Sequence, residues 1–221
     1  MAFNPYKGFY VSTVIFDAPW DEELENLETR KGEMGQCTPE RPDNIQSYMK
    51  WLSFRSKDGN MYTKPAVPDK GEVPEDYQWT SLYYDNPILK SIIDWFPVEK
   101  TRVRLAEAKP HGYLKYHYDW DNKRHGYDVN EHQTRIWIQL TDTESWYRLS
   151  NGDCDVHFKM VRGQFAIIDT DCVLHATENR DDNPRRNILM HAKTNFWVKN
   201  ITELFPRHTI IDPRVNSNQP H

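Results

Sequence analysis

The sequence contains little cysteine, no long hydrophobic run and no concentrated block of basic residues. Its 3 cysteines are widely spaced over 221 residues and form no C-x-x-C pair, so neither a zinc ribbon nor a disulfide framework is expected. No stretch approaches the roughly 18 apolar residues of a membrane span, and no secretory signal pattern opens the chain. We therefore expect a cytoplasmic protein with reduced thiols and no membrane partner.

The charge balance does not suggest a nucleic-acid partner. The 28 Lys and Arg residues are outnumbered by 33 Asp and Glu residues, which gives a formal net charge of −5, and no basic run reaches the density of a nucleic-acid footprint. The G-x-S-x-G, P-loop and G-x-G-x-x-G motifs are also absent from the sequence. These absences remove the best-known signatures of serine hydrolases and nucleotide-binding enzymes.

The length and composition fit one folded domain. A chain of 221 residues lies within the range of a single domain, and 8 Trp, 12 Tyr and 9 Phe supply bulky core material. The pattern changes near residue 100. We interpret residues 1–100 as a supporting layer of helices and loops, residues 101–200 as a jelly-roll core, and residues 201–221 as a C-terminal tail.

Three helices are expected in the first hundred residues. The segment from Asp21 to Thr29 begins with the carboxylates that helix N-termini favour. The segment from Asp43 to Phe54 places apolar residues at helical spacing. A third, short helix is predicted to open at Asn86-Pro87 and to end before Pro97.

From residue 101 onward the sequence favours strands. Apolar and polar residues alternate, or β-branched and aromatic residues cluster, in segments 102–105, 135–140, 156–160, 164–168 and 187–192. Residues 151–153 and Arg162-Gly163 are expected to form hairpin turns. Many short strands at regular spacing predict a sandwich or barrel. The expected fold is mainly β with flanking helices, as a cupin-like jelly-roll.

His117 and Asp119 form an H-x-D motif within strand-like sequence. Residues i and i+2 of a strand project from the same face, so the imidazole and the carboxylate are expected to lie side by side. A second histidine from a neighbouring strand would complete the two-His, one-carboxylate face of non-haem Fe(II) oxygenases. Alone the motif is weak, because about one such match is expected by chance in a chain of this length.

The order of residues downstream makes the pattern more specific. His175 lies six residues past Asp169, and Arg185 lies ten residues past His175. An arginine can hold the distal carboxylate of a dicarboxylic acid with two parallel hydrogen bonds, which a lysine cannot match. The sequence therefore predicts that His175 is the second histidine and that Arg185 binds a carboxylate.

This region resembles the Fe(II)/2-oxoglutarate dioxygenases, and within them the aspartyl/asparaginyl β-hydroxylase-like group that includes free-proline hydroxylases. The resemblance covers residues 111–198 and is carried by His117-Tyr118-Asp119, residues 134–140, residues 163–169, His175 and residues 185–189. It implies a double-stranded β-helix fold, Fe(II) bound by His117, Asp119 and His175, and 2-oxoglutarate and O2 as cosubstrates. It also implies that Arg185 binds the distal carboxylate of 2-oxoglutarate, or Arg186 if the preceding loop carries an extra residue, with Gln139 as a further cosubstrate contact.

The implied reaction is hydroxylation of an unactivated carbon of a free amino acid, an amino-acid derivative or a peptidyl residue, with succinate and CO2 as products. Asp119 favours hydroxylation over halogenation, because related halogenases lack this carboxylate. Two alternatives remain open. One is a non-catalytic cupin-fold binding protein with a vestigial metal site, and the other is the same site with desaturation, epimerisation or ring formation as its outcome.

Three further residues are candidates for contacts with the substrate. Trp120 follows the metal motif directly and either contacts substrate or belongs to a solvated loop. Arg135 either binds a substrate carboxylate or faces solvent. His191 either lines the pocket or is an ordinary core histidine.

Overall fold

Strands predominate in the computed structural model, which describes residues 8–28, 35–36, 49–62, 74–118, 133–150, 155–170, 173–193, 198, 200–205 and 207–215. The strands of the first hundred residues are β1 (Phe9–Phe16), β2 (Gly35–Gln36), β3 (Met49–Ser56) and β4 (Gln78–Trp79). The others are β5 (Lys100–Ala108), β6 (Tyr113–His117), β7 (Gln133–Gln139), β8 (Ser145–Ser150), β9 (Asp155–Lys159), β10 (Gln164–Ile168), β11 (Leu174–Asn179), β12 (Arg185–Lys193) and β13 (Thr209–Ile211). The helices are α1 (Asp21–Glu28), α2 (Ser81–Asp85), α3 (Pro87–Asp94) and α6 (Ile201–Leu204), with a 3-10 turn over Pro74–Asp76.

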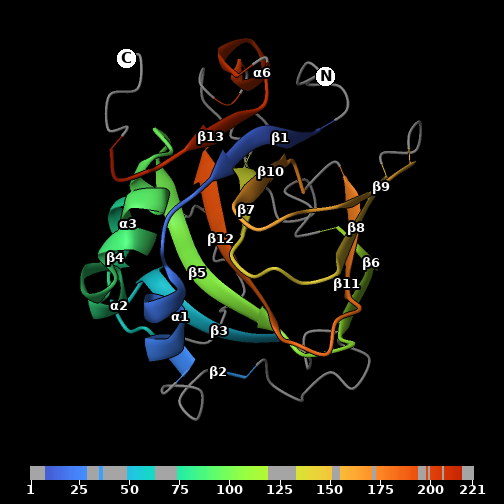
Figure 1. Ribbon diagram of the computed structural model, residues 1–221. Helices are drawn as coiled ribbons and strands as arrows, with labels where there is room; N and C mark the ends of the chain where they lie inside the picture. Colours follow the sequence, from blue (N-terminus) through green and yellow to red (C-terminus); the bar gives the residue numbers. More distant parts are fainter. Residues whose placement is uncertain are drawn as a thin grey trace.

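The strands form two sheets that face each other. The larger sheet has the order β13-β1-β10-β7-β12-β5-β3-β2, with β4 paired to β3, and the smaller has the order β6-β11-β8-β9. Between β5 and β12 the chain passes repeatedly from one sheet to the other, so that β5, β7, β10 and β12 lie opposite β6, β8, β9 and β11 (Figure 1). This is the jelly-roll, or double-stranded β-helix, that the sequence predicted.

Helices cover the outer face of the larger sheet (Figure 1). Leu89, Ile92 and Ile93 of α3 are fully buried there, in a cluster that includes Val103 and Leu105 of β5. Full burial of one such side chain contributes about 1.5–3 kcal/mol. The other face of β5 turns toward the smaller sheet, so every residue of this strand is buried. Both faces of the larger sheet are therefore shielded from water at β5.

The cluster of buried apolar side chains between the sheets is smaller than the cluster under the helices. A smaller cluster there joins Trp137 and Ile168 of the larger sheet to Tyr147 and Leu149 of the smaller one. The rings of Trp137 and Tyr147 lie 5.4 Å apart. This cluster occupies one part of the interior, and the remainder holds the polar residues described below.

The first hundred residues contribute more strand than the sequence suggested. The expected helix over Asp43–Phe54 is wrong where it is described, because residues 49–56 form β3 and pair with β5. The interpretation of residues 1–100 as a supporting layer of helices and loops did not include β1, whose residues alternate between half-buried and buried. Both strands cover what would otherwise be open edges of the jelly-roll, since β1 pairs with β10 and β3 with β5. The helices expected after Pro19-Trp20 and at Asn86-Pro87 are confirmed as α1 and α3.

The turn at Arg162-Gly163 is present, but it does not form a hairpin. It joins β9 to β10, and these strands belong to different sheets. Gly163 has φ +81°, and a Cβ atom built on it would lie 2.1 Å from the carbonyl oxygen of Phe16. Only glycine fits this crossing. The other expected hairpin turn, at residues 151–153, lies outside the described residues.

Among the described helices, none has both the length and the apolar character that crossing a membrane requires.

Candidate functional site

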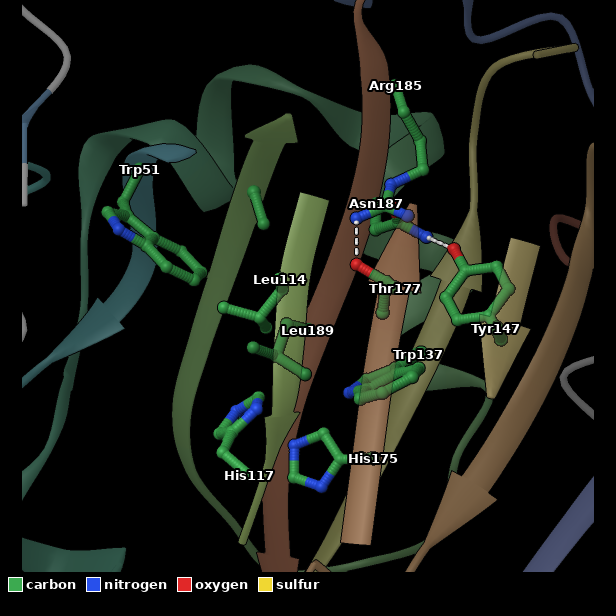
Figure 2. Close-up of a pocket in the computed structure, with 11 residues that line it drawn as sticks. Trp51, Leu114, His117, Trp137, Tyr147, His175, Thr177, Arg185, Asn187 and Leu189 are labelled. Atoms are coloured by element: carbon green, nitrogen blue, oxygen red, sulfur yellow. Dashed lines mark hydrogen bonds between the residues drawn. The ribbon is translucent and has the colours of Figure 1, made fainter. Parts of the chain in front are cut away.

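A pocket of about 90 Å³ lies between the two sheets. Its lining comes from β3, β5, β7 and β12 on one side and from β6, β8 and β11 on the other, and consists of Trp51, Ala106, Leu114, His117, Trp137, Tyr147, His175, Thr177, Arg185, Asn187 and Leu189. Figure 2 shows two histidines at one end of the pocket and an arginine at the other, with leucine and aromatic side chains between them. Three of the residues proposed from the sequence, His117, His175 and Arg185, therefore share one cavity.

The two histidines are held together by strand register. His117 on β6 is directly opposite His175 on β11 in an antiparallel pair, and their ring centroids are 4.1 Å apart. His175 is only 2% exposed, and its ring lies 5.6 Å from that of Trp137. Side chains directly opposite on neighbouring strands share a face, so both imidazoles project into the pocket.

Both imidazoles present the same nitrogen to a backbone carbonyl. Nδ1 of His117 lies 2.8 Å from the carbonyl oxygen of Lys115, and Nδ1 of His175 lies 3.1 Å from that of Val173. A carbonyl oxygen can only accept, so in each ring Nδ1 carries the hydrogen and Nε2 carries the lone pair in the neutral form. This arrangement of hydrogen bonds is the one that orients histidines as metal ligands.

The donor set of the described residues therefore fits two positions of a divalent transition-metal site. Imidazole nitrogens suit iron among other first-row metals. Asp119 and Trp120 lie outside the described residues. Within the described part of the chain, no group of three or more His, Cys, Asp and Glu side chains is placed to hold a metal ion.

Arg185 forms the opposite end of the pocket. Its Nη2 donates a 2.9 Å hydrogen bond to Oγ1 of Thr177, and its Cζ atom lies 5.2 Å from the centre of the Tyr147 ring. The side chain is buried, with the residue 3% exposed, and Nε and Nη1 have no hydrogen-bond partner among the described residues. A buried guanidinium with two unused donors is costly unless an anion completes it. The site is therefore suited to binding a carboxylate.

Arg186 occupies the other face of β12. Its Nε donates a 2.9 Å hydrogen bond to Oε2 of Glu107, and both side chains are buried. Burial lowers the pKa of Arg186 from its usual value. Because neighbouring residues of a strand point to opposite faces, only Arg185 of the two candidate arginines faces the pocket.

Gln139 is fully buried and contacts two residues that line the pocket. Its Oε1 accepts hydrogen bonds from the Tyr147 hydroxyl at 2.9 Å and from Nδ2 of Asn187 at 3.0 Å. Its Nε2 donates to the carbonyl oxygen of Thr141 and to Oγ1 of Thr143. Both ends of the amide are hydrogen-bonded to the protein, and these bonds fix Tyr147 and Asn187, which line the pocket. The direct contact of Gln139 with a cosubstrate stays a prediction.

Arg135 and His191 also face the interior. They lie opposite each other on β7 and β12, on the same faces as Trp137 and Leu189, and both are buried. Arg135 therefore does not face solvent. Sequence reasoning did not select Arg102 and Arg104 of β5, which are buried on the inner face of that strand. The sequence feature that could have identified them is their alternation with Val103 and Leu105, which places the two arginines on one face of the strand.

Comparison with known proteins supports the fold and goes no further. No family model matches the chain, and no curated protein matches it either. Among solved structures, the chain is similar to a prolyl-4-hydroxylase from Pseudomonas putida, with a TM-score of 0.50 and 12% identity over 85% of this chain and 94% of that one. It is also similar to an oxidoreductase of the 2OG-Fe(II) oxygenase family from Burkholderia pseudomallei, with a TM-score of 0.47 and 12% identity over 79% of each chain. At 12% identity the likeness to the prolyl-4-hydroxylase structure shows a shared fold.

Proposed function

We propose that this protein is an Fe(II)- and 2-oxoglutarate-dependent oxygenase that hydroxylates a carbon of an amino acid, an amino-acid derivative or a peptidyl residue. One observation carries the proposal: a single pocket holds two histidines with Nε2 as the lone-pair nitrogen at one end and a buried arginine with two unused donors at the other. A dicarboxylic acid that is bound to a metal by one end requires these two features in one cavity.

Iron, when bound, supplies oxidation of a substrate carbon–hydrogen bond by O2, coupled to conversion of 2-oxoglutarate to succinate and CO2. His117 and His175 would hold the ion, with Asp119 as the third ligand from its H-x-D spacing with His117. Of the residues not yet assigned, Trp120 is retained as a candidate substrate contact.

Arg185 and Thr177 would bind the distal carboxylate of 2-oxoglutarate. Nε and Nη1 of Arg185 supply two charge-assisted donors. Thr177 already accepts a hydrogen bond from Arg185, so its own hydroxyl hydrogen remains to be donated to the carboxylate. Leu114 and Leu189 lie between the two ends of the pocket (Figure 2) and make its middle apolar.

The experiment is succinate formation by purified protein supplied with Fe(II), ascorbate, 2-oxoglutarate and O2, with and without a pooled amino-acid library. We expect succinate above a metal-free control, and an increase with one pool. His175→Ala should abolish both turnover and iron binding while the protein remains folded. His157→Ala is the matched control, because His157 lies on the exposed face of β9.

Two results would contradict the proposal. A fully active His175→Ala variant would refute the metal-ligand assignment. Wild-type protein that binds neither Fe(II) nor 2-oxoglutarate would point instead to a cupin-fold binding protein. Mass spectrometry of the product separates hydroxylation, which adds one oxygen atom, from desaturation, ring formation or epimerisation on the same site.

A further inference from the structure

The pocket between the sheets has two halves, which lie side by side. The strands that line it follow the order β7-β12-β5-β3 in the larger sheet and β8-β11-β6 in the smaller one. The ring centroids of Trp137 on β7 and Tyr147 on β8 are 5.4 Å apart, so these two strands face each other at one side of the pocket. The strands of the other side are therefore β3, β5 and β6, and Figure 2 shows Trp51 of β3 and Tyr147 at opposite sides.

The half of the pocket at β8, β11 and β12 is polar. Arg185 donates a 2.9 Å hydrogen bond to Thr177, and Nδ2 of Asn187 donates one of 2.9 Å to the Tyr147 hydroxyl. The proposed function places 2-oxoglutarate here, against Arg185. The half at β3, β5 and β6 then remains for another ligand.

This second half is apolar. Trp51 of β3 lies directly opposite Ala106 of β5, and Leu189 packs against this pair. Leu114 of β6 adds a further hydrocarbon side chain from the smaller sheet. Of the described residues that line the pocket from β3, β5 and β6, His117 alone has an ionisable side chain. A polar group placed among these residues would give up hydrogen bonds to water with little to replace them, whereas burial favours a hydrocarbon group.

Ala106 determines how much room this half contains. In the larger sheet it pairs with Trp51 on one side and with Asn187 on the other, and its own side chain is a single methyl group. Because this methyl group lines the pocket, carbon atoms added to it would extend into the cavity. The space beside it adjoins His117, which lines the same half and is a candidate metal ligand.

We infer that the group oxidised by this protein is a hydrocarbon side chain of an amino acid, which binds against the indole of Trp51, and that Ala106 limits its size. This inference rests on the proposed function, because it assigns the second half of the same pocket to the substrate. Trp51 comes from β3, which lies outside the jelly-roll core that the sequence predicted. The layer formed by the first hundred residues would therefore select the substrate, while the jelly-roll core binds the metal and 2-oxoglutarate.

The first test compares amino acids of similar shape and different polarity. Leucine is paired with asparagine and valine with threonine, each supplied free and as its N-acetyl amide to the iron-loaded protein with 2-oxoglutarate, and succinate is measured. The hydrocarbon member of each pair should give half-maximal stimulation at a concentration at least about tenfold lower, because its side chain gains free energy on burial. Phenylalanine is compared with leucine to separate an aromatic from an aliphatic preference.

Two variants examine the residues that form this half. Trp51→Leu removes the indole and Ala106→Leu fills the space beside it. Each should raise the concentration of the preferred substrate for half-maximal stimulation at least about tenfold, with the KM for 2-oxoglutarate unchanged within about twofold. Trp146→Leu is the matched control, since Trp146 lies on the outer face of β8 with its ring 4.7 Å from that of His157. Thermal unfolding establishes that each variant is folded, and Trp51→Leu alone suffices if Ala106→Leu is not.

The second test needs neither iron nor turnover. The protein is labelled with fluorotryptophan, and the fluorine NMR signals of Trp51 and Trp146 are identified by their loss in Trp51→Leu and Trp146→Leu. Leucine, phenylalanine and asparagine, free and as N-acetyl amides, are titrated in turn. The Trp51 signal should shift with at least one hydrocarbon ligand and not with asparagine, while the Trp146 signal stays in place.

The outcomes separate this inference from the proposed function. If the polar and hydrocarbon members stimulate succinate formation equally and Trp51→Leu has no effect, the oxygenase stands and the hydrocarbon substrate is wrong. If the Trp51 signal responds to hydrocarbon ligands alone but no succinate forms under any condition, the binding site stands and the oxygenase proposal fails. A Trp51 signal that responds as strongly to asparagine as to leucine would also overturn the inference.

Discussion

Arg185→Met separates a ligand-binding arginine from a structural one, because the two roles predict opposite changes in stability. The substitution keeps most of the side-chain volume and removes the charge. It deletes the hydrogen bond to Thr177 and the contact with the Tyr147 ring, which together are worth about 1–3 kcal/mol. It also removes a buried cation with two unused donors, whose burial costs several kcal/mol. The free energy of unfolding of ligand-free protein should therefore fall by no more than about 1 kcal/mol, or rise.

Binding of 2-oxoglutarate should respond much more strongly. Nε and Nη1 would each give one charge-assisted hydrogen bond to the distal carboxylate, and each is worth about 1.5–3 kcal/mol. The loss is then at least about 3 kcal/mol, or a roughly hundredfold or greater increase in Kd. Arg185→Lys should recover only part of it, because a single ammonium nitrogen cannot place donors at the positions of both Nε and Nη1.

The assay is calorimetric titration of 2-oxoglutarate into protein loaded with Mn(II), which should occupy the proposed metal site without supporting turnover. Urea unfolding of the ligand-free variants gives the second quantity. Arg180→Gln, an exposed arginine paired with Glu178, is the control. The reasoning is refuted if Arg185→Met binds 2-oxoglutarate within about threefold of wild type. It is also refuted if the substitution costs more than about 3 kcal/mol of stability, since Arg185 would then be part of the framework.

Three other predictions concern the framework. Glu107→Gln should lower the free energy of unfolding by about 3–5 kcal/mol, because it removes the charge of the carboxylate that pairs with the buried Arg186. Adding Arg186→Met should restore most of this loss, as measured by urea unfolding, and neither variant should change the affinity for 2-oxoglutarate. Burial lowers the pKa of Lys100 to about 8, so the unfolded chain binds a proton at this lysine more tightly than the folded one. The free energy of unfolding, relative to that of Lys100→Met, should therefore rise by about 3 kcal/mol between pH 8 and 10.5. If the two proteins differ by the same free energy at every pH in that range, the pKa assignment is wrong. Gly163→Ala should cost at least about 2 kcal/mol, because its Cβ would meet the Phe16 carbonyl oxygen; Gly59→Ala, also at positive φ but facing only a flexible glutamine side chain, should cost about half as much in the same thermal-unfolding measurement.

Much of the jelly-roll was predictable, because its strands keep a period of two and lie between turn residues. The segments expected at 135–140 and 164–168 correspond to β7 and β10. β3 was misassigned because its tryptophan, leucine and phenylalanine suit a helix and a strand equally well. Only the partner strand β5 decides between them, by pairing with β3 in register. That pairing is a long-range contact, which local spacing does not contain.

The candidate site was predicted where local geometry fixes it and missed where tertiary packing does. His117 and His175 needed only strands of the expected kind, while the choice between Arg185 and Arg186 depended on which face of β12 meets the smaller sheet. The alternation of Arg102 and Arg104 with apolar residues is typical of a half-exposed strand. Here helices cover one face and the smaller sheet covers the other, so the polar face turns inward. A period of two identifies two faces, but it does not say which of them meets water.

The position of β6 at the edge of the smaller sheet has a consequence for how the protein would respond to a metal. This strand has β11 as its one neighbour in the described sheet, and His117 is its last residue. An ion bound by both His117 and His175 would cross-link the end of this edge strand to its neighbour β11. Loading with a divalent metal should then slow hydrogen exchange of the β6 backbone amides far more than that of β8. Hydrogen exchange of β6 would thus measure metal binding without any assay of activity.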